Sequence, residues 1–398
     1  MTHHERMLAT VRREPTDLIP WAPRMDLWWI AQRARGTLPP QFEGLSTPGI
    51  ADVLDVGCRL MRADYTTDTR PECFVVRALG IDNHPDLPYR VELRDLPVEF
   101  ESDGHNFRTT IETSAGTLTM RLRHTTDMER RGISLPFIEV YPIKSTADLA
   151  AVAQVFQHME VIPTPDGYHD LQATVGERGL AVAGGASAAS PMHLIMHDMM
   201  PMTEFFYLYA DSPAELHHLV DSITPVFEAI LDTVMMCDCE VAFWGSNYDQ
   251  NTTWPKFFQA EIAPWLQRVA ERLHAGGKYL LTHTDGENQK LLPYYPACNF
   301  DIAESVCTQP MTHCTLADVL AGVGERTTVW GGIPSIALLE HSMSDEAFAE
   351  YLDQLFASIG TGERLILGVA DDVPPDAILD RLKLIEERIE AFGPVRPG

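Results

Sequence analysis

Short apolar runs alternate with longer amphipathic stretches over the C-terminal two thirds of the chain. A short apolar run is typical of a buried parallel strand, and apolar residues at helical spacing indicate an amphipathic helix. Repeated units of this kind favour a parallel sheet. The predicted strands are 179–186, 240–247, 278–283, 301–306, 327–333 and 364–369, and the predicted helices are 147–158, 191–209, 213–237, 256–275, 315–322, 344–359 and 375–391.

The N-terminal part begins with a predicted helix over 3–14, a short strand over 17–24 and a helix over 26–35. A further helical pattern covers 50–63. This number of strand–helix units favours a closed (β/α)8 TIM barrel, and 398 residues suit a single barrel domain over 1–398. A doubly wound open sheet is the alternative, but no GxGxxG motif follows the first strand.

Residues 85–140 have a different pattern, in which apolar and polar positions alternate. The alternation covers 91–100, 106–114 and 117–124, with turn signals at Asp103-Gly104 and Ala115-Gly116. Alternation of period two between turn residues predicts an antiparallel hairpin or small sheet. We expect a β-rich insertion on the barrel, forming a cap or the surface of a homodimer.

Charge and composition exclude some functions. The formal net charge is −27, from 57 acidic and 30 basic residues, and it disfavours nucleic acid and anionic membranes as partners. No segment approaches the roughly 20 apolar residues of a membrane helix, and the N-terminus has no signal-peptide core. Seven scattered cysteines suit reduced thiols. We therefore expect a cytoplasmic protein.

Polar residues with acid–base or metal-ligand chemistry follow several predicted strands. His283 and Asp285 end one strand, and because they lie two apart their side chains point to the same side. Glu304 ends the next strand, and Asp371 and Asp372 follow the last. In a barrel these carboxyl ends converge on one mouth, where active sites lie. A turn at the strand end, a salt bridge or helix capping are the structural alternatives for these residues.

Further candidates for the pocket wall are aromatic, amide and imidazole side chains. Trp244, Asn247 and Asp249 follow the 240–247 strand. His193 and His197 lie four apart in a methionine-rich stretch, without the glutamate of an HExxH motif. The methionines are more often core packing than a cofactor site. The predicted substrate contacts are Trp244, Asn247, Asp249, His197, Met192 and Arg24.

Four motifs in order resemble the uroporphyrinogen decarboxylase superfamily. They are ERMLATVRREPTDLIP (5–20), HTDG (283–286), TTVWGGI (327–333) and GERLILGVADDVPPD (362–376). The resemblance covers nearly the whole chain apart from the insertion. That superfamily includes the decarboxylase itself and zinc methyltransferases that work with corrinoid proteins.

The chain departs from both branches. The corrinoid methyltransferases carry His-x-Cys-Gly and a later cysteine as zinc ligands, whereas this chain has His283 with Asp285, and Asp371 or Asp372 near the position of the later ligand. The decarboxylase has an arginine-rich N-terminal segment for the carboxylates of a porphyrinogen. Here Arg24 is followed by Asp26, and an acidic chain argues against a basic tetrapyrrole pocket.

Replacement of thiolate ligands by oxygen ligands has a chemical consequence. A metal with imidazole and carboxylate ligands is a harder Lewis acid, suited to a departing oxygen. The resemblance thus implies a methyltransferase of the O-demethylase type. It would move a methyl group from a small methoxylated donor to the cobalamin of a corrinoid protein. The expected metal is Zn²⁺, held by His283, Asp285, Glu304 and Asp371, and the expected catalytic residues are His283, Asp285 and Glu304.

Two other functions remain open from the sequence. A metal-independent decarboxylase acting on a small carboxylic acid would use His283 and Asp285 to move protons. A non-catalytic barrel would only bind a ligand.

Overall fold

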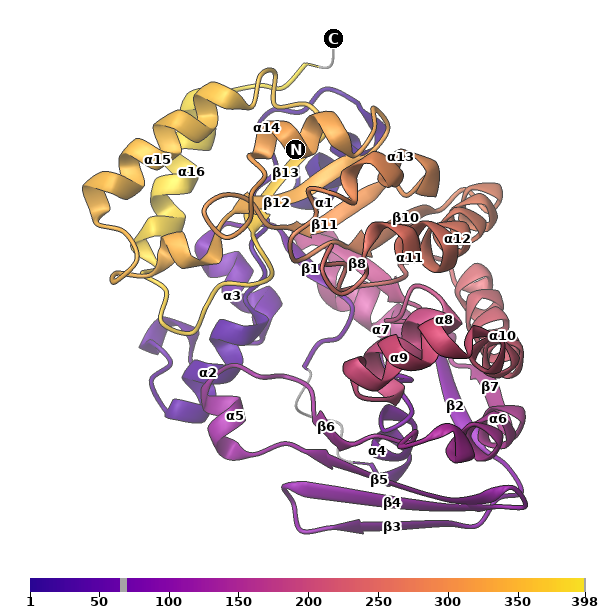
Figure 1. Cartoon of the computed structure of the whole chain (residues 1–398). Coiled ribbons are helices and arrows are strands. Elements are labelled where there is room, and N and C mark those ends of the chain that lie inside the picture. The colour runs from indigo at the N-terminus through magenta and orange to yellow at the C-terminus, as the bar shows by residue number, and fades with distance from the viewer. Residues whose placement is uncertain (65–69, 397–398) are drawn as a thin grey trace.

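A curled parallel sheet surrounded by helices forms the centre of the protein in a computed structural model that describes residues 1–64 and 70–396 (Figure 1). The strand order is β1-β8-β9-β10-β11-β12-β13, and every pair is parallel. This arrangement fits a TIM-barrel-like fold. The strands are β1 (Cys58–Leu60), β8 (Gly179–Gly184), β9 (Val241–Phe243), β10 (Tyr279–His283), β11 (Ile302–Val306), β12 (Thr328–Ile333) and β13 (Leu365–Val369).

The predicted strand over 17–24 is reduced to a single bridge at Trp21. Ala22 N donates to Leu367 O, and Leu367 N donates to Pro20 O. On the other side, Gly57 N, just before β1, donates to Trp21 O. Both edges of the seven-stranded sheet therefore bond to the same segment. The prolines at 20 and 23 lack N–H donors, which limits the hydrogen-bond ladder to these few contacts.

The predicted helical pattern over 50–63 is wrong in its second half. Helix α3 (Thr47–Leu54) ends where Asp55 adopts φ 51°, and Cys58–Leu60 then pairs with Gly179–Ala181 as strand β1. Three residues are too few to reveal a strand period. The error matters because β1 places Arg59 in the interior of the sheet.

The remaining helices cover the sheet and connect its strands (Figure 1). The predicted continuous helix over 191–209 is wrong: a five-residue π-helix over 195–199 and Pro201 divide it into α8 and α9. The helices are α1 (His3–Arg12), α2 (Asp26–Arg35), α4 (Pro71–Arg77), α5 (Thr126–Arg130), α6 (Leu149–Gln157), α7 (Pro165–Val175), α8 (Pro191–Leu194), α9 (Met202–Asp211), α10 (Pro213–Met236), α11 (Pro255–Phe257), α12 (Ala263–Ala275), α13 (Tyr295–Cys298), α14 (Leu316–Gly322), α15 (Asp345–Ser358) and α16 (Asp380–Phe392).

An antiparallel sheet lies in the region where the sequence alternates, at the lower edge of Figure 1. Its strands are β3 (Val98–Ser102), β4 (Asn106–Thr113), β5 (Gly116–Arg123) and β6 (Phe137–Val140), in that order. A separate pair joins β2 (Tyr89–Leu93) to β7 (Met159–Pro163), so the β-rich part continues beyond residue 140. None of the helices in the described ranges is long and apolar enough to cross a membrane.

Candidate active site

Side chains at the carboxyl ends of the parallel strands surround a cavity of about 180 Å³. The cavity is lined from β1, from the segments that follow β8, β9 and β13, and by Ser134 and Leu135 of the segment between α5 and β6. A cavity of this volume has room for a single-ring molecule.

A buried imidazole–carboxylate pair forms one side of the cavity. His283, the last residue of β10, lies opposite Glu304 of β11 in the parallel register. Its Nδ1 lies 2.5 Å from Glu304 Oε2, which leaves Nε2 for the cavity side. Burial acts to lower the pKa of His283, but the charges of Glu304 and Asp285 outweigh it, so the pKa is raised. The imidazolium form, with a proton on Nε2, is thereby favoured.

Two arginines hold the same carboxylate in its charged form. Arg59 lies 3.7 Å from Glu304 Oε2, and Arg24 lies 3.9 Å from Oε1. Burial acts to raise the pKa of Glu304, but Arg59, His283 and Arg24 hold it well below its usual range. Glu304 is therefore a fixed anion that orients and charges His283.

Asp285 and Asp371 approach the free nitrogen of the same imidazole. Asp285 Oδ1 lies 3.6 Å and Asp371 Oδ1 3.7 Å from His283 Nε2. Asp285 Oδ1 is buried and has no hydrogen-bond partner in the described part of the chain, and burial raises the pKa of Asp285. Asp285 does not line the cavity, so it acts on the site through the imidazole of His283.

The backbone is strained where these side chains are positioned. Ser305, Asp371 and Asn247 have φ values of 66°, 61° and 62°, in the left-handed region that non-glycine residues seldom adopt. At Ser305 the β11–β12 register shifts, and the Ser305 hydroxyl accepts a 2.7 Å hydrogen bond from Asp371 N. The bulge thereby links the end of β11 to the loop after β13.

A second imidazole–carboxylate pair lies in the π-helix. His197 Nδ1 is 3.2 Å from Asp198 Oδ2, and its Nε2 is 3.2 Å from the Asn247 amide nitrogen. Asp198 raises the pKa of His197 despite burial. His193, one turn earlier, has a pKa lowered to about 3 by burial and is neutral. Of the predicted substrate contacts, His197, Asn247 and Arg24 line the cavity.

Other predicted site residues lie elsewhere. Trp244 and Met192 are buried outside the lining, and the Trp244 indole donates to Ala189 O. Asp249 accepts hydrogen bonds from Asn251 N and Glu287 N and so stabilises a loop. Asp372 accepts a hydrogen bond from Leu27 N in the first turn of α2 and does not cap the helix that follows it in the sequence.

Three cavity arginines escaped prediction: Arg59, Arg62 and Arg77. Arg59 and Arg62 lie within 50–63, which the sequence analysis predicted as a helix, and Arg77 is the last residue of α4. Arg59 and Arg62 lie three apart, which is not the spacing of one strand face, so the sequence offered no signal for them. The acidity of the whole chain was therefore a poor guide to the charge of its cavity, which is rich in arginine.

The arrangement of the predicted zinc ligands does not fit a metal. Across residues 1–64 and 70–396, no three His, Cys, Asp or Glu side chains are grouped to hold an ion. Glu304 is bonded to His283 and faces two guanidinium groups, and Arg24 also lies 3.8 Å from Asp371. These positive charges would repel a divalent cation. Zinc binding by these side chains, expected from the sequence, is therefore not proposed, and the protein's own groups are left to move protons.

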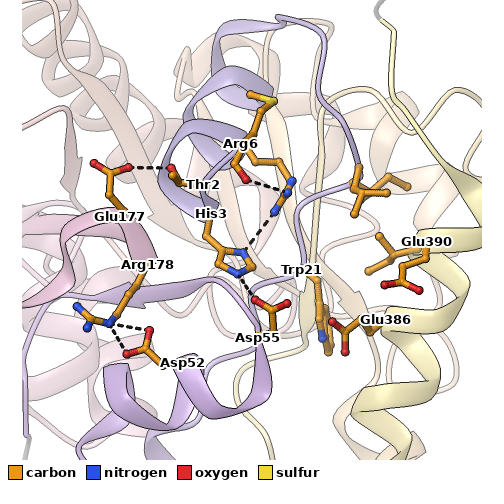
Figure 2. Close-up of a pocket in the computed structure, with 14 residues that line it drawn as sticks. Thr2, His3, Arg6, Trp21, Asp52, Asp55, Glu177, Arg178, Glu386 and Glu390 are labelled. Carbon is orange, nitrogen blue, oxygen red and sulfur yellow. Dashed lines mark hydrogen bonds and ion pairs between the residues drawn. The ribbon is translucent and has the colours of Figure 1, made fainter.

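A larger cavity of about 700 Å³ lies at the other end of the sheet, between α1, α3 and α16 (Figure 2). Its visible contacts are structural: Arg178 Nε donates to both Asp52 oxygens at 2.7 Å, and His3 lies 3.4 Å from Asp55. The amino ends of barrel strands contribute to stability, whereas active sites lie at the carboxyl ends. The smaller cavity is therefore the candidate active site.

The fold and the strand-end cavity define a TIM-barrel-like protein with its polar site at the carboxyl edge of the sheet. A model of the family "Uroporphyrinogen decarboxylase (URO-D)" matches residues 124–392, so the chain belongs to the uroporphyrinogen decarboxylase family. In fold it is similar to a methyltransferase from Methanosarcina mazei, with a TM-score of 0.57 and 13% identity. The similarity covers 98% of this chain and 99% of that chain. A comparison with curated proteins found no similar sequence.

Proposed function

We propose that this protein is a methyltransferase of the uroporphyrinogen decarboxylase family. It takes a methyl group from the oxygen of a small methoxylated donor and passes it to cob(I)alamin on a corrinoid protein. Family membership and the similarity in fold to a methyltransferase over nearly the whole chain support this proposal. The size of the cavity agrees with a single-ring donor.

The buried His283–Glu304 pair is the observation that carries the proposal. When a methyl group leaves an ether oxygen, the C–O bond breaks, both of its electrons stay on the oxygen, and the methyl group bonds to the acceptor. The oxygen then needs a proton. His283 has a raised pKa and an Nε2 that faces the cavity, so it can donate that proton as a general acid. Glu304 stabilises the imidazolium and acts as a positioning residue.

Decarboxylation of a small carboxylic acid is the second candidate, favoured by the arginines around the cavity. Arginine binds carboxylates through paired N–H donors, and a carbanion left by loss of CO₂ would need the same proton from His283. The two reactions differ in their co-reactant. Methyl transfer requires a methyl acceptor, whereas decarboxylation releases CO₂ without one.

The test is an anaerobic assay with methoxybenzoates and reduced cobalamin, in which methylcobalamin is followed by its absorbance. We expect methylcobalamin and the phenol in equal amounts with the wild type, and a loss of 10²-fold or more in His283→Gln. His217→Gln is the matched control, because His217 pairs with Glu261 at the surface at 3.6 Å. Carbon dioxide release without an acceptor, and no methylcobalamin, would replace the proposal by the decarboxylase.

A further inference from the structure

The β-rich insertion reaches the active-site cavity through one short segment between α5 and β6. Of the described residues that line the cavity, only Ser134 and Leu135 lie in the insertion. The lining is mostly polar, and its other apolar side chains are Met61, Ala188 and Phe243. Leu135 is therefore the one apolar side chain that the insertion places in the site.

Contacts on both sides of this segment hold Leu135 in place. Figure 1 shows α5 beside α2, and the chain passes close to α2 again at Gly132, directly after α5. Gly132 has a φ of 83°, and a Cβ atom there would lie only 2.7 Å from Leu27 O. The His124 ring, directly after β5, has its Nε2 3.0 Å from Ile133 O, and β6 then pairs with β5. The segment is thus fixed between the barrel and the inserted sheet.

A second cavity of about 180 Å³ adjoins the same segment. It lies between α4 and the inserted sheet, and its wall includes Phe74 of α4 and Phe107 of β4. Ser134 and Leu135 line both this cavity and the active-site cavity. The Leu135 side chain therefore belongs to the wall between the two cavities.

We propose that Leu135 sets the size of the methyl donor by closing the active-site cavity toward the second cavity. A single ring fits beside His283, whereas a second fused ring that extends toward the inserted sheet meets Leu135. An apolar pocket discriminates by about 10- to 200-fold for each methylene group. The inference rests on the proposed function in taking this cavity as the substrate site, and it makes the insertion the element that selects the donor.

Calorimetric titration of the full chain without cobalamin tests this size limit. The probes are 4-methoxybenzoate and 6-methoxy-2-naphthoate, which differ by one fused ring. We expect the wild type to bind the benzoate about tenfold more tightly or better. Leu135→Ala should lower this preference by about tenfold or more, because the naphthoate gains access to the second cavity. Equal binding of the two probes by the wild type, or binding of neither, would overturn the inference.

Three further variants separate size selection from a structural role. Ile133→Ala is the matched control, because Ile133 is 40% exposed and lines neither cavity, and it should leave the preference unchanged. Leu135→Met keeps the volume and should keep the preference. Equal weakening of both probes by Leu135→Ala would mean a structural role and overturn the assignment. If Leu135→Ala does not fold, Leu135→Val decides, because it also shortens the side chain and must lower the preference.

The outcomes distinguish this inference from the proposed function. A shift in size preference on binding, without methylcobalamin formation by the wild type or any variant, would refute the methyltransferase and leave the role of Leu135 in place. Methylcobalamin formation from both probes with equal kcat/KM in the wild type and in Leu135→Ala would do the reverse.

Discussion

Replacement of Glu304 by glutamine removes the central negative charge of the site at nearly constant volume. Glu304 is 1% exposed and faces three cationic groups: His283 at 2.5 Å, Arg59 at 3.7 Å and Arg24 at 3.9 Å. Two unit charges about 4 Å apart interact by roughly 4 kcal/mol at an effective dielectric constant of about 20. Loss of one partner of a buried ion pair costs about 3–5 kcal/mol. Because glutamine keeps an acceptor oxygen, we expect a loss near the lower limit, about 3 kcal/mol.

Urea denaturation followed by circular dichroism measures this loss. The control is Asp353→Asn, which removes a 2.8 Å ion pair with Arg388 at the surface and should cost less than about 1 kcal/mol. If Glu304→Gln is no more costly than the control, the reasoning about the buried carboxylate is refuted. A second readout is the pH profile of activity. Without Glu304 the pKa of His283 falls, so activity that needs the imidazolium should be lost at lower pH than in the wild type.

Three further predictions concern the same site. Because the pKa of His283 is raised, His283 stabilises the folded state below about pH 6.5, and this stabilisation is lost as pH rises through the folded-state pKa. Because the pKa of Glu304 is lowered, Glu304 stabilises the folded state above about pH 4.3, and this stabilisation is lost on acidification. The melting temperature that His283→Gln loses relative to the wild type should therefore be largest between these limits; a loss that grows above pH 7 would contradict this. Asp285→Asn removes a negative charge that lies 3.6 Å from His283 Nε2 and helps to raise the pKa of His283, so it should lower turnover; unaltered kcat would exclude Asp285 from the chemistry. Metal analysis of wild type and His283→Ala should find no stoichiometric zinc in either protein, and zinc that disappears in the variant would restore the metal-assisted reaction.

The amino-acid sequence determined the repeated strand–helix units in the C-terminal part of the fold. The apolar runs that became β8 and β10–β13 have strong local patterns, and the polar residues after them mark their carboxyl ends. Because parallel strands bring those ends to one edge, the meeting of His283, Asp285 and Glu304 followed from chain order alone. The antiparallel strands were likewise visible as a period of two.

Only the tertiary structure decided what surrounds these residues. Strand β1 is three residues long, too short for its residues to show the alternation of a strand. The segment around Trp21 joins both edges of the sheet through only a few backbone hydrogen bonds. The guanidinium groups of Arg59 and Arg77 come from a strand and a helix that no local pattern relates to His283. The charges of Arg59, His283 and Arg24 make Glu304 an anion bonded to His283 instead of an open metal ligand. Periodicity reports local burial along one segment, whereas the charge of a cavity depends on which distant segments pack around it.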